Sequence, residues 1–361
     1  MLSRRQFISA SAALAICGCR STADRSFVIG GVLPLTGDGS SYGAAAANGA
    51  RLAIDLYNAS PDGRGSPVRW QVEDSRGDPV SAASAARKLI DVDGAGALIG
   101  DVTSAGTHAI LPIATRARIP LISPAASDPA LSGASPFFAR VWPSDLFEAG
   151  VIGRHATDRG YRAIGVLYSN DDYGSGFARA FRNAVGNRVS FEAAFPTNSS
   201  DFRPLVRRLS AQHADAVLIV ALPERAGLIL RQMAEARLAL PVLATASIED
   251  PQVASLSNAG SIVFASPAPV DAASATRRQF EAEYRRAYRA EPGVLADTGY
   301  DCARLLIEAY RANPDPAAMM AWMKSRRNYD GASGRMSFAP SGDVEKEYRL
   351  KGGRAGGFTW L

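Results

Sequence analysis

Short apolar runs alternate with longer helical patterns through most of this chain, and this alternation constrains its fold more than any other feature. The apolar runs are rich in Val, Ile and Leu, which is typical of strands covered on both faces. Strands are expected at 27–33, 68–74, 96–100, 119–123, 163–169, 189–195, 215–221, 241–245 and 261–265. Helices are expected at 43–59, 81–91, 104–117, 145–159, 173–185, 200–212 and 223–237. Such alternation predicts an α/β fold with parallel sheets and right-handed crossovers.

The alternation breaks in the Pro/Ser-rich passage 123–145 and again near 266–276 and 325–335. With 361 residues, the chain is also too long for one typical core. We therefore expect two α/β lobes joined by three connecting strands. The expected boundaries assign 27–143 plus 268–325 to lobe 1, and 144–267 plus 326–361 to lobe 2.

The N-terminus has the pattern of a signal peptide, which we assign to residues 1–18. Arg4 and Arg5 form a positive start, and the apolar stretch 7–16 that follows is too short to span a bilayer. The string SRRQFI also resembles a twin-arginine export signal. Both that route and the general secretory route remain open, and either predicts an exported protein.

The end of this segment, Ile16-Cys17-Gly18-Cys19, looks like a bacterial lipobox. Cleavage ahead of Cys19 would discard Cys17 and make Cys19 the lipidated first residue, followed by a polar tether over 19–26. Cys302 would then be the only thiol of the mature chain, which excludes an internal disulfide. The alternative is an ordinary pair of cysteines without a role. Lipidation predicts a protein in the periplasm or on the outer face of the cell membrane.

Composition and short motifs argue against several other classes of protein. The formal net charge is +5, but the basic residues are scattered, so binding to nucleic acid is not expected. The three histidines lie outside any metal-ligand spacing, and the Gly-rich segment 30–43 departs from the GxGxxG pattern of dinucleotide sites. We expect no metal, no cofactor and no catalytic residues.

Several segments, taken in order, resemble type I periplasmic binding proteins of the branched-chain amino-acid (Leu/Ile/Val) group. They include GGVLPLTGDGSSYG, ALIGDVTSAGTHAI, IPLISPAASDPAL, FFARVWPSD, GVLYSNDDYGSGFARAF and GRMSFAPSGD, and the resemblance extends from residue 27 to about 358. It implies two doubly wound parallel-sheet lobes with a three-strand hinge and a ligand cleft between them. It also implies a monomeric solute-binding protein that delivers an amino acid or related small carboxylate to the permease and ATPase subunits of an ABC importer.

The resemblance places the ligand carboxylate at the loop 101–107, which leads into a helix whose free N–H groups can bind an anion. Ser104 matches the family's carboxylate-binding serine, and Thr107 can add a second hydroxyl. Ala125 and Ser127, after the next strand, are expected to complete the clamp. The alternatives are that Ser104 only caps the helix and that Ser127 only caps a turn.

Two tyrosines match family positions that face the ligand, Tyr42 from the first lobe and Tyr173 from the second. The acidic residue that neutralises the ligand ammonium in amino-acid binders falls near Ala246 and is missing there. Either Glu249 or Asp250 loops back to replace it, or the ligand is an aromatic or aliphatic acid without an amine. The cost of an unpaired ammonium slightly favours the second option.

Two other functions are compatible with parts of this pattern. A ligand sensor that reports to a regulator would share the fold and the cleft. An α/β enzyme acting on a small acid would need a base or nucleophile in the cleft, and the sequence shows no Ser/His or Cys/His set.

Overall fold

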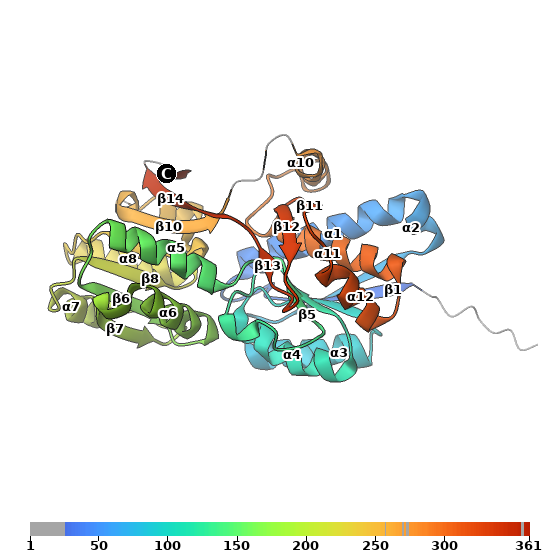
Figure 1. The fold of residues 1–361 in the computed structure, drawn as a ribbon, viewed down its shortest axis with the longest axis horizontal. Coiled ribbons are helices and arrows are strands. Elements are labelled where there is room, and N and C mark those ends of the chain that lie inside the picture. The colour runs from blue at the N-terminus through green and yellow to red at the C-terminus, as the bar shows by residue number, and fades with distance from the viewer. Residues whose placement is uncertain (1–25, 257, 269–270, 272–273, 355–356) are drawn as a thin grey trace, which may run out of the picture.

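The computed structural model describes residues 26–256, 258–268, 271, 274–354 and 357–361. The expected signal peptide, Cys17, the lipidation site Cys19 and nearly all of the expected tether lie outside these residues. The described part of the chain forms two lobes that lie side by side (Figure 1).

Lobe 1 is built on a parallel sheet with the strand order β2-β1-β3-β4-β5. Its strands are β1 (Phe27–Leu33), β2 (Val68–Asp74), β3 (Ala97–Gly100), β4 (Leu121–Ser123) and β5 (Phe138–Arg140). Its helices are α1 (Ser40–Ala59), α2 (Pro61–Gly65), α3 (Pro79–Asp91), α4 (Ser104–Ala117), α10 (Ala275–Tyr288), α11 (Ala296–Ala312) and α12 (Pro316–Lys324). One apolar core packs α1, α11 and α12 on the sheet, and a separate core packs α3 and α4. The lobe is therefore doubly wound.

Lobe 2 is built on a larger sheet with the strand order β15-β14-β10-β9-β8-β6-β7. Its strands are β6 (Ile164–Ser169), β7 (Val189–Phe195), β8 (Ala216–Val220), β9 (Val242–Ala244), β10 (Ile262–Pro267), β14 (Tyr348–Arg354) and β15 (Gly357–Trp360). Its helices are α5 (Asp145–Asp158), α6 (Asp172–Val185), α7 (Arg203–Ser210), α8 (Pro223–Glu235) and α9 (Pro251–Ala254). Helices α7, α8 and α9 contribute to one apolar core, and α5 and α6 to the other.

The C-terminal part of the chain differs from the sequence-based expectation. Strands β14 and β15 join the lobe 2 sheet antiparallel, and β11 (Tyr329–Gly331), β12 (Gly334–Phe338) and β13 (Val344–Glu345) form a small separate sheet. Met336 and Phe338 are buried in the core of lobe 1. The boundary expected at 326 is therefore wrong, because residues of β12 and β13 pack on lobe 1 before the chain crosses to β14.

The chain passes between the lobes three times, and the third passage lies C-terminal to the break seen in the sequence at 325–335. It crosses between β5 and α5, between β10 and α10, and between β13 and β14. The last crossing is the red segment that runs from β13 toward β14 in Figure 1. Each expected strand is present within two residues of its predicted ends. Within the described ranges, no helix has both the length and the apolar character required to cross a membrane.

Two glycines allow helices α1 and α11 to approach closely. A Cβ atom on Gly49 would overlap the carbonyl oxygen of Ala296, and a Cβ atom on Gly299 would overlap that of Ala46. Both overlaps are with main-chain atoms, which cannot rotate away as a side chain can. The contact between these helices thus requires residues without a side chain.

We predict that Gly299→Ala lowers the free energy of unfolding by about 1–3 kcal/mol, because the added methyl group forces α1 and α11 apart. Gly150→Ala in α5 is the matched control, since the nearest atom to its added Cβ is Arg154 Nη1 at 3.6 Å. That substitution should be neutral or stabilising by up to about 1 kcal/mol, as expected for Gly to Ala in a helix. Urea unfolding of the parent and the two variants measures both effects. Equal stability of Gly299→Ala and the parent would show that the contact between α1 and α11 does not require glycine at residue 299.

Candidate functional site

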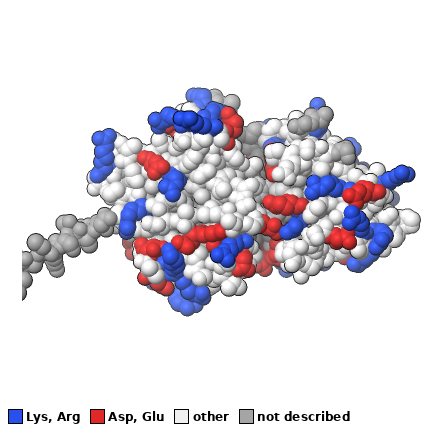
Figure 2. Space-filling view, turned by 180° about the vertical axis from the view of Figure 1, so that it is seen from behind, with Lys and Arg blue, Asp and Glu red and all other residues white. Residues whose placement is uncertain are grey.

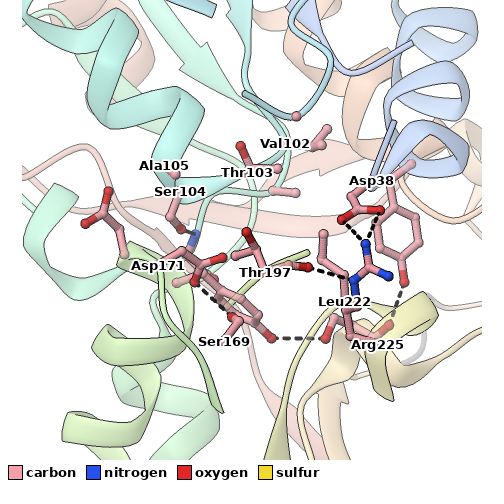
Figure 3. A pocket seen from close by; sticks show the side chains of 18 of the residues that line it. Asp38, Val102, Thr103, Ser104, Ala105, Ser169, Asp171, Thr197, Leu222 and Arg225 are labelled. Carbon is pink, nitrogen blue, oxygen red and sulfur yellow. Dashed lines mark hydrogen bonds and ion pairs between the residues drawn. The ribbon is translucent and has the colours of Figure 1, made fainter. Parts of the chain in front are cut away.

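A cavity of about 500 Å³ lies between the two lobes and is lined by residues from both. Lobe 1 contributes the segments that follow β1, β3 and β4, and lobe 2 contributes those that follow β6, β8 and β9. These are the carboxyl ends of parallel strands, where ligands bind in doubly wound sheets. The cavity therefore occupies the position expected for the ligand cleft (Figure 3).

The start of helix α4 reaches the cavity wall and has free hydrogen-bonding groups. Thr103 is the N-cap, since its Oγ1 accepts a hydrogen bond from Gly106 N at 3.1 Å. Ser104 is therefore not the cap, and that alternative is wrong. Its Oγ instead accepts hydrogen bonds from the N–H groups of Ser127 and Asp128, at 3.3 and 3.2 Å. With both acceptor positions of the hydroxyl used, its proton remains available to a ligand oxygen.

Thr107 does not line the cavity, contrary to the expectation from the sequence. Its side chain is buried, and its hydroxyl lies 2.8 Å from the carbonyl oxygen of Thr103 and 3.1 Å from that of Asp101. Residue 107 lies one turn into the helix, so its hydroxyl bonds back to the preceding carbonyl groups. Ala125 and Ser127 do line the cavity, on the segment after β4.

The two tyrosines line the cavity and link it to the segment after β9. Tyr42 Oη donates a hydrogen bond across the cleft to the carbonyl oxygen of Ser247 at 2.7 Å. Tyr173 Oη donates to Thr245 Oγ1 at 2.6 Å and lies 3.0 Å from Ser247 Oγ. The tyrosine from lobe 1 therefore bridges the two lobes, whereas the tyrosine from lobe 2 is held within its own lobe.

A second bridge between the lobes is an ion pair at the cavity wall. Arg225 Nη2 of α8 lies 3.1 and 2.8 Å from the two carboxylate oxygens of Asp38, and its Nε donates to the carbonyl oxygen of Thr197 (Figure 3). Sequence reasoning missed both charged residues, because they are separated by 187 positions. The two bridges hold the lobes together over the cavity.

The two acidic residues after β9 that the sequence offered as partners for a ligand ammonium lie outside the cavity wall. Ala246 lines the cavity, but Glu249 pairs with Lys351 of β14, and Asp250 caps α9 by accepting from Gln252 N at 2.8 Å. Neither acid lines the cavity. The option in which Glu249 or Asp250 loops back to the ligand is therefore wrong.

Two carboxylates that the sequence analysis missed do line the cavity, Asp145 and Glu148 in the first turn of α5. Asp145 is 1% exposed and its Oδ2 has no hydrogen-bond partner among the described residues. Glu148 is 2% exposed, and its Oε1 accepts a hydrogen bond from Ala246 N at 2.6 Å. Burial raises the pKa of Asp145 to about 7, and burial together with the charge of Asp145 raises the pKa of Glu148 well above its ordinary value. The spacing i, i+3 directly ahead of the apolar run 149–153 was the available signal.

Apolar side chains form part of the wall, beside polar residues that include Arg76, Asn170, Asp171 and Asp172. Leu222 of lobe 2 packs in one cluster with Tyr42 and Val102 of lobe 1, and Trp142 joins this cluster from the first crossing between the lobes. The cluster places flat and branched apolar surface beside the polar groups. A small molecule with one apolar part and one or two charged groups therefore suits this cavity.

Basic and acidic side chains are interspersed over both lobes on the face seen in Figure 2. Among the residues that the structure describes, no cluster of three or more His, Cys, Asp or Glu side chains could hold a metal ion. The described residues of the cavity wall include neither His nor Cys. Cys302 is buried in the core of lobe 1, and burial raises the pKa of its thiol.

The sequence matches a family model described as periplasmic binding protein over residues 26–351. The Leu/Ile/Val-binding protein homolog 3 of Brucella melitensis biotype 1 is 23% identical over 349 residues, which cover 94% of each chain. The leucine binding protein LivK of Thermotoga maritima MSB8 has a TM-score of 0.86 at 26% identity, over 93% of this chain and 97% of that one. A solute binding protein of an ABC transporter from Rhodopseudomonas palustris BisB5, in complex with 3,4-dihydroxy benzoic acid, shares the fold with a TM-score of 0.82 at 22% identity, over 93% and 96%.

The raised pKa of Asp145 predicts how stability depends on pH. Between its ordinary value of 3.8 and about 7, the folded protein binds more protons at this group than the unfolded chain does. The free energy of unfolding therefore falls as pH rises, by up to about 1.4 kcal/mol per pH unit for one such group.

Asp145→Asn removes this group, so the variant should lose stability less steeply over the same range. Urea unfolding of ligand-free protein at several pH values between those limits measures the two slopes. Identical slopes for the parent and the variant would show that Asp145 ionises in the folded protein as it does in the unfolded chain.

Proposed function

Because the chain belongs to the periplasmic binding protein family, as its sequence predicted, we propose that it captures a small carboxylate-bearing solute for an ABC importer. The observation that carries this proposal is the cavity between the lobes, with the start of α4 and the free proton of Ser104 at its wall. The solute is an amino acid or a related small acid. The same fold serves both classes among its relatives, since one binds leucine and another was determined with 3,4-dihydroxy benzoic acid.

The carboxylate of the solute binds at the start of α4. The first N–H groups of a helix have no acceptor within the helix, and the helix dipole favours negative charge there. Ser104 adds a hydroxyl donor, and Ser127 extends the same surface from the segment after β4. A carboxylate in this position receives several charge-assisted hydrogen bonds in a cavity enclosed by both lobes, where such bonds are stronger than in bulk water.

Solute binding and closure of the lobes are coupled, because the cavity wall is formed by residues of both lobes. The solute touches both lobes only when they are together, so it shifts the equilibrium toward the closed arrangement. The pairs Tyr42–Ser247 and Asp38–Arg225 add direct contacts to that arrangement. A permease that recognises the closed shape then receives loaded protein in preference to empty protein.

We also propose that the protein is exported and held at a membrane by lipid on Cys19. The lipobox-like Ile16-Cys17-Gly18-Cys19 and the charged, then apolar, segment before it support this assignment. A tethered binding protein remains close to its permease, which raises the effective concentration of the two partners.

We predict that Ser104→Ala weakens solute binding by about 1–3 kcal/mol, because it removes a charge-assisted hydrogen bond from a desolvated site. Native mass spectrometry of the purified protein first identifies the bound solute, and calorimetry then compares the two proteins. Ser210→Ala at the end of α7 is the control, since this serine is exposed on lobe 2 and lies outside the cavity wall. Unchanged affinity of Ser104→Ala would show that the carboxylate binds elsewhere.

For the anchor, we predict that Cys19→Ser moves the protein from the membrane fraction to the soluble fraction. The variant should retain the thermal stability and solute affinity of the parent, because the described fold begins after this position. Immunoblots of cell fractions measure the distribution, and equal membrane retention of the two proteins would contradict lipidation at Cys19.

A further inference from the structure

We propose that Arg140 is the positioning residue of the carboxylate site and acts on the solute through Ser104. This inference rests on the proposed function as a carboxylate-binding protein, and it identifies what holds the donor of that site in place. Arg140 ends β5 and is fully buried, and it does not belong to the cavity wall. Its effect on a bound carboxylate must therefore pass through other residues.

All five N–H groups of the Arg140 guanidinium have acceptors. Nη1 donates to the carbonyl oxygens of Ala126 and Asp128, at 3.2 and 2.9 Å. Nη2 donates to Ser132 Oγ at 2.8 Å, and both Nε and Nη2 lie 2.7 Å from Asp343 Oδ1. Asp343 balances the buried charge, which would be costly without a partner. The side chain is thus fixed in one orientation, with two of its donors directed at the main chain of the segment after β4.

These two main-chain bonds fix the peptide unit that orients Ser104. The carbonyl group of Ala126 and the N–H group of Ser127 belong to one peptide unit, which is planar. Arg140 donates to its oxygen, and Ser104 Oγ accepts from its nitrogen at 3.3 Å. Asp128 is held in the same way, since its carbonyl oxygen accepts from Arg140 and its N–H group donates to Ser104 Oγ at 3.2 Å. The arginine therefore sets the direction of both N–H groups that reach the serine.

The direction of these N–H groups decides which way the serine hydroxyl donates. While they occupy its two acceptor positions, its proton is available to a carboxylate in the cavity. If the peptide unit 126–127 turned over, its carbonyl oxygen would face Ser104 Oγ and accept that proton. The solute carboxylate would then lose a donor inside an enclosed cavity, which is costly. Arg140 opposes this arrangement by donating to the same carbonyl oxygen from the other side of the peptide unit.

Arg140 also connects the carboxylate site to the third crossing between the lobes. Arg140 N donates to the carbonyl oxygen of Gly342 at 3.0 Å, and Asp343 directly precedes β13. A Cβ atom on Gly342 would lie 2.2 Å from the carbonyl oxygen of Phe138, so this turn is packed tightly on β5. The ion pair between Arg140 and Asp343 therefore joins the site to the chain just ahead of the last crossing.

The test measures affinity by calorimetry on full-length mature protein stripped of bound solute. A thermal-shift panel of the twenty proteinogenic amino acids, their deaminated analogues and 3,4-dihydroxybenzoate first selects the acid that stabilises the parent most. That acid is the probe for every variant. Arg140→Lys keeps a charge beside Asp343, but one ammonium group cannot replace a planar fork that also reaches two carbonyl groups. We expect this variant to bind the probe about 10-fold or more weakly than the parent does.

A double-mutant cycle separates positioning from a general effect on the fold. In the Ser104→Ala background, Arg140→Lys should weaken binding by less than about 3-fold, because the donor that Arg140 positions is already absent. A purely structural role would give the same fold-change in both backgrounds. Leu89→Ala is the control for stability, since Leu89 of α3 is buried in lobe 1 and lies outside the cavity wall. It should lower the melting temperature without changing the affinity.

Asp343→Asn provides a second variant in which the arginine is intact. It removes the charge that holds Nε and Nη2 and keeps the size of the side chain, so it tests the inference even if Arg140→Lys does not fold. We expect the same pattern with a smaller effect, about 3- to 10-fold in the parent and little in the Ser104→Ala background.

The outcomes distinguish this inference from the proposed function. If Ser104→Ala weakens binding but the folded variants at Arg140 and Asp343 bind like the parent, the inference is wrong and the function stands. Equal fold-changes in both backgrounds, or unchanged affinity of Ser104→Ala, would also overturn the inference. If the parent binds no acid of the panel, the proposed carboxylate-binding function fails, and this inference fails with it.

Discussion

The site depends on one constraint, which is that two separate parallel sheets present the carboxyl ends of their strands to each other. Loops at those ends contain the helix starts and the free main-chain groups. One sheet alone would offer these groups to water, where an anion gains little from them. The two facing sheets enclose a cavity of about 500 Å³, and inside it the same groups interact more strongly with an anion. The three crossings keep the two sheets facing each other.

Charge is distributed unevenly across this cavity, and the arrangement has a physical logic. The lobe 1 side offers donors at α4, whereas the lobe 2 side offers the acceptors of Asp145 and Glu148. The family resemblance led us to expect an acidic side chain at residue 246, and a carboxylate from another helix lies beside that position instead. Glu148 reaches Ala246 from another helix, so its carboxylate lies beside that position although residue 246 has no acidic side chain.

Most of the fold was predictable because buried parallel strands leave a strong local signal. Most of the strands β1 to β4 and β6 to β10 are apolar runs bounded by turns, and each lies within two residues of its predicted ends. Strand β5 is three residues long within a Pro/Ser-rich passage, and β11 to β15 each contain an exposed polar residue. Such strands are stabilised by their neighbours in the sheet rather than by their own apolar pattern, so local sequence did not reveal them. The same reason explains the misplaced boundary at 326.

The residues of the candidate site also fall into those that the sequence indicates and those that only the tertiary structure brings together. Sequence alone, through the family resemblance, pointed to five residues that do line the cavity, namely Tyr42, Ser104, Ala125, Ser127 and Tyr173. Tertiary structure alone decided which groups meet across the cleft, such as Asp38 with Arg225, and Glu148 with Ala246. It also removed Thr107 and Glu249 from the cavity, by hydrogen bonds to main-chain carbonyls and by Lys351. Helix starts and strand ends depend on residues that are adjacent in the sequence. Contacts between residues 98 or 187 positions apart form only when the two lobes have folded and come together.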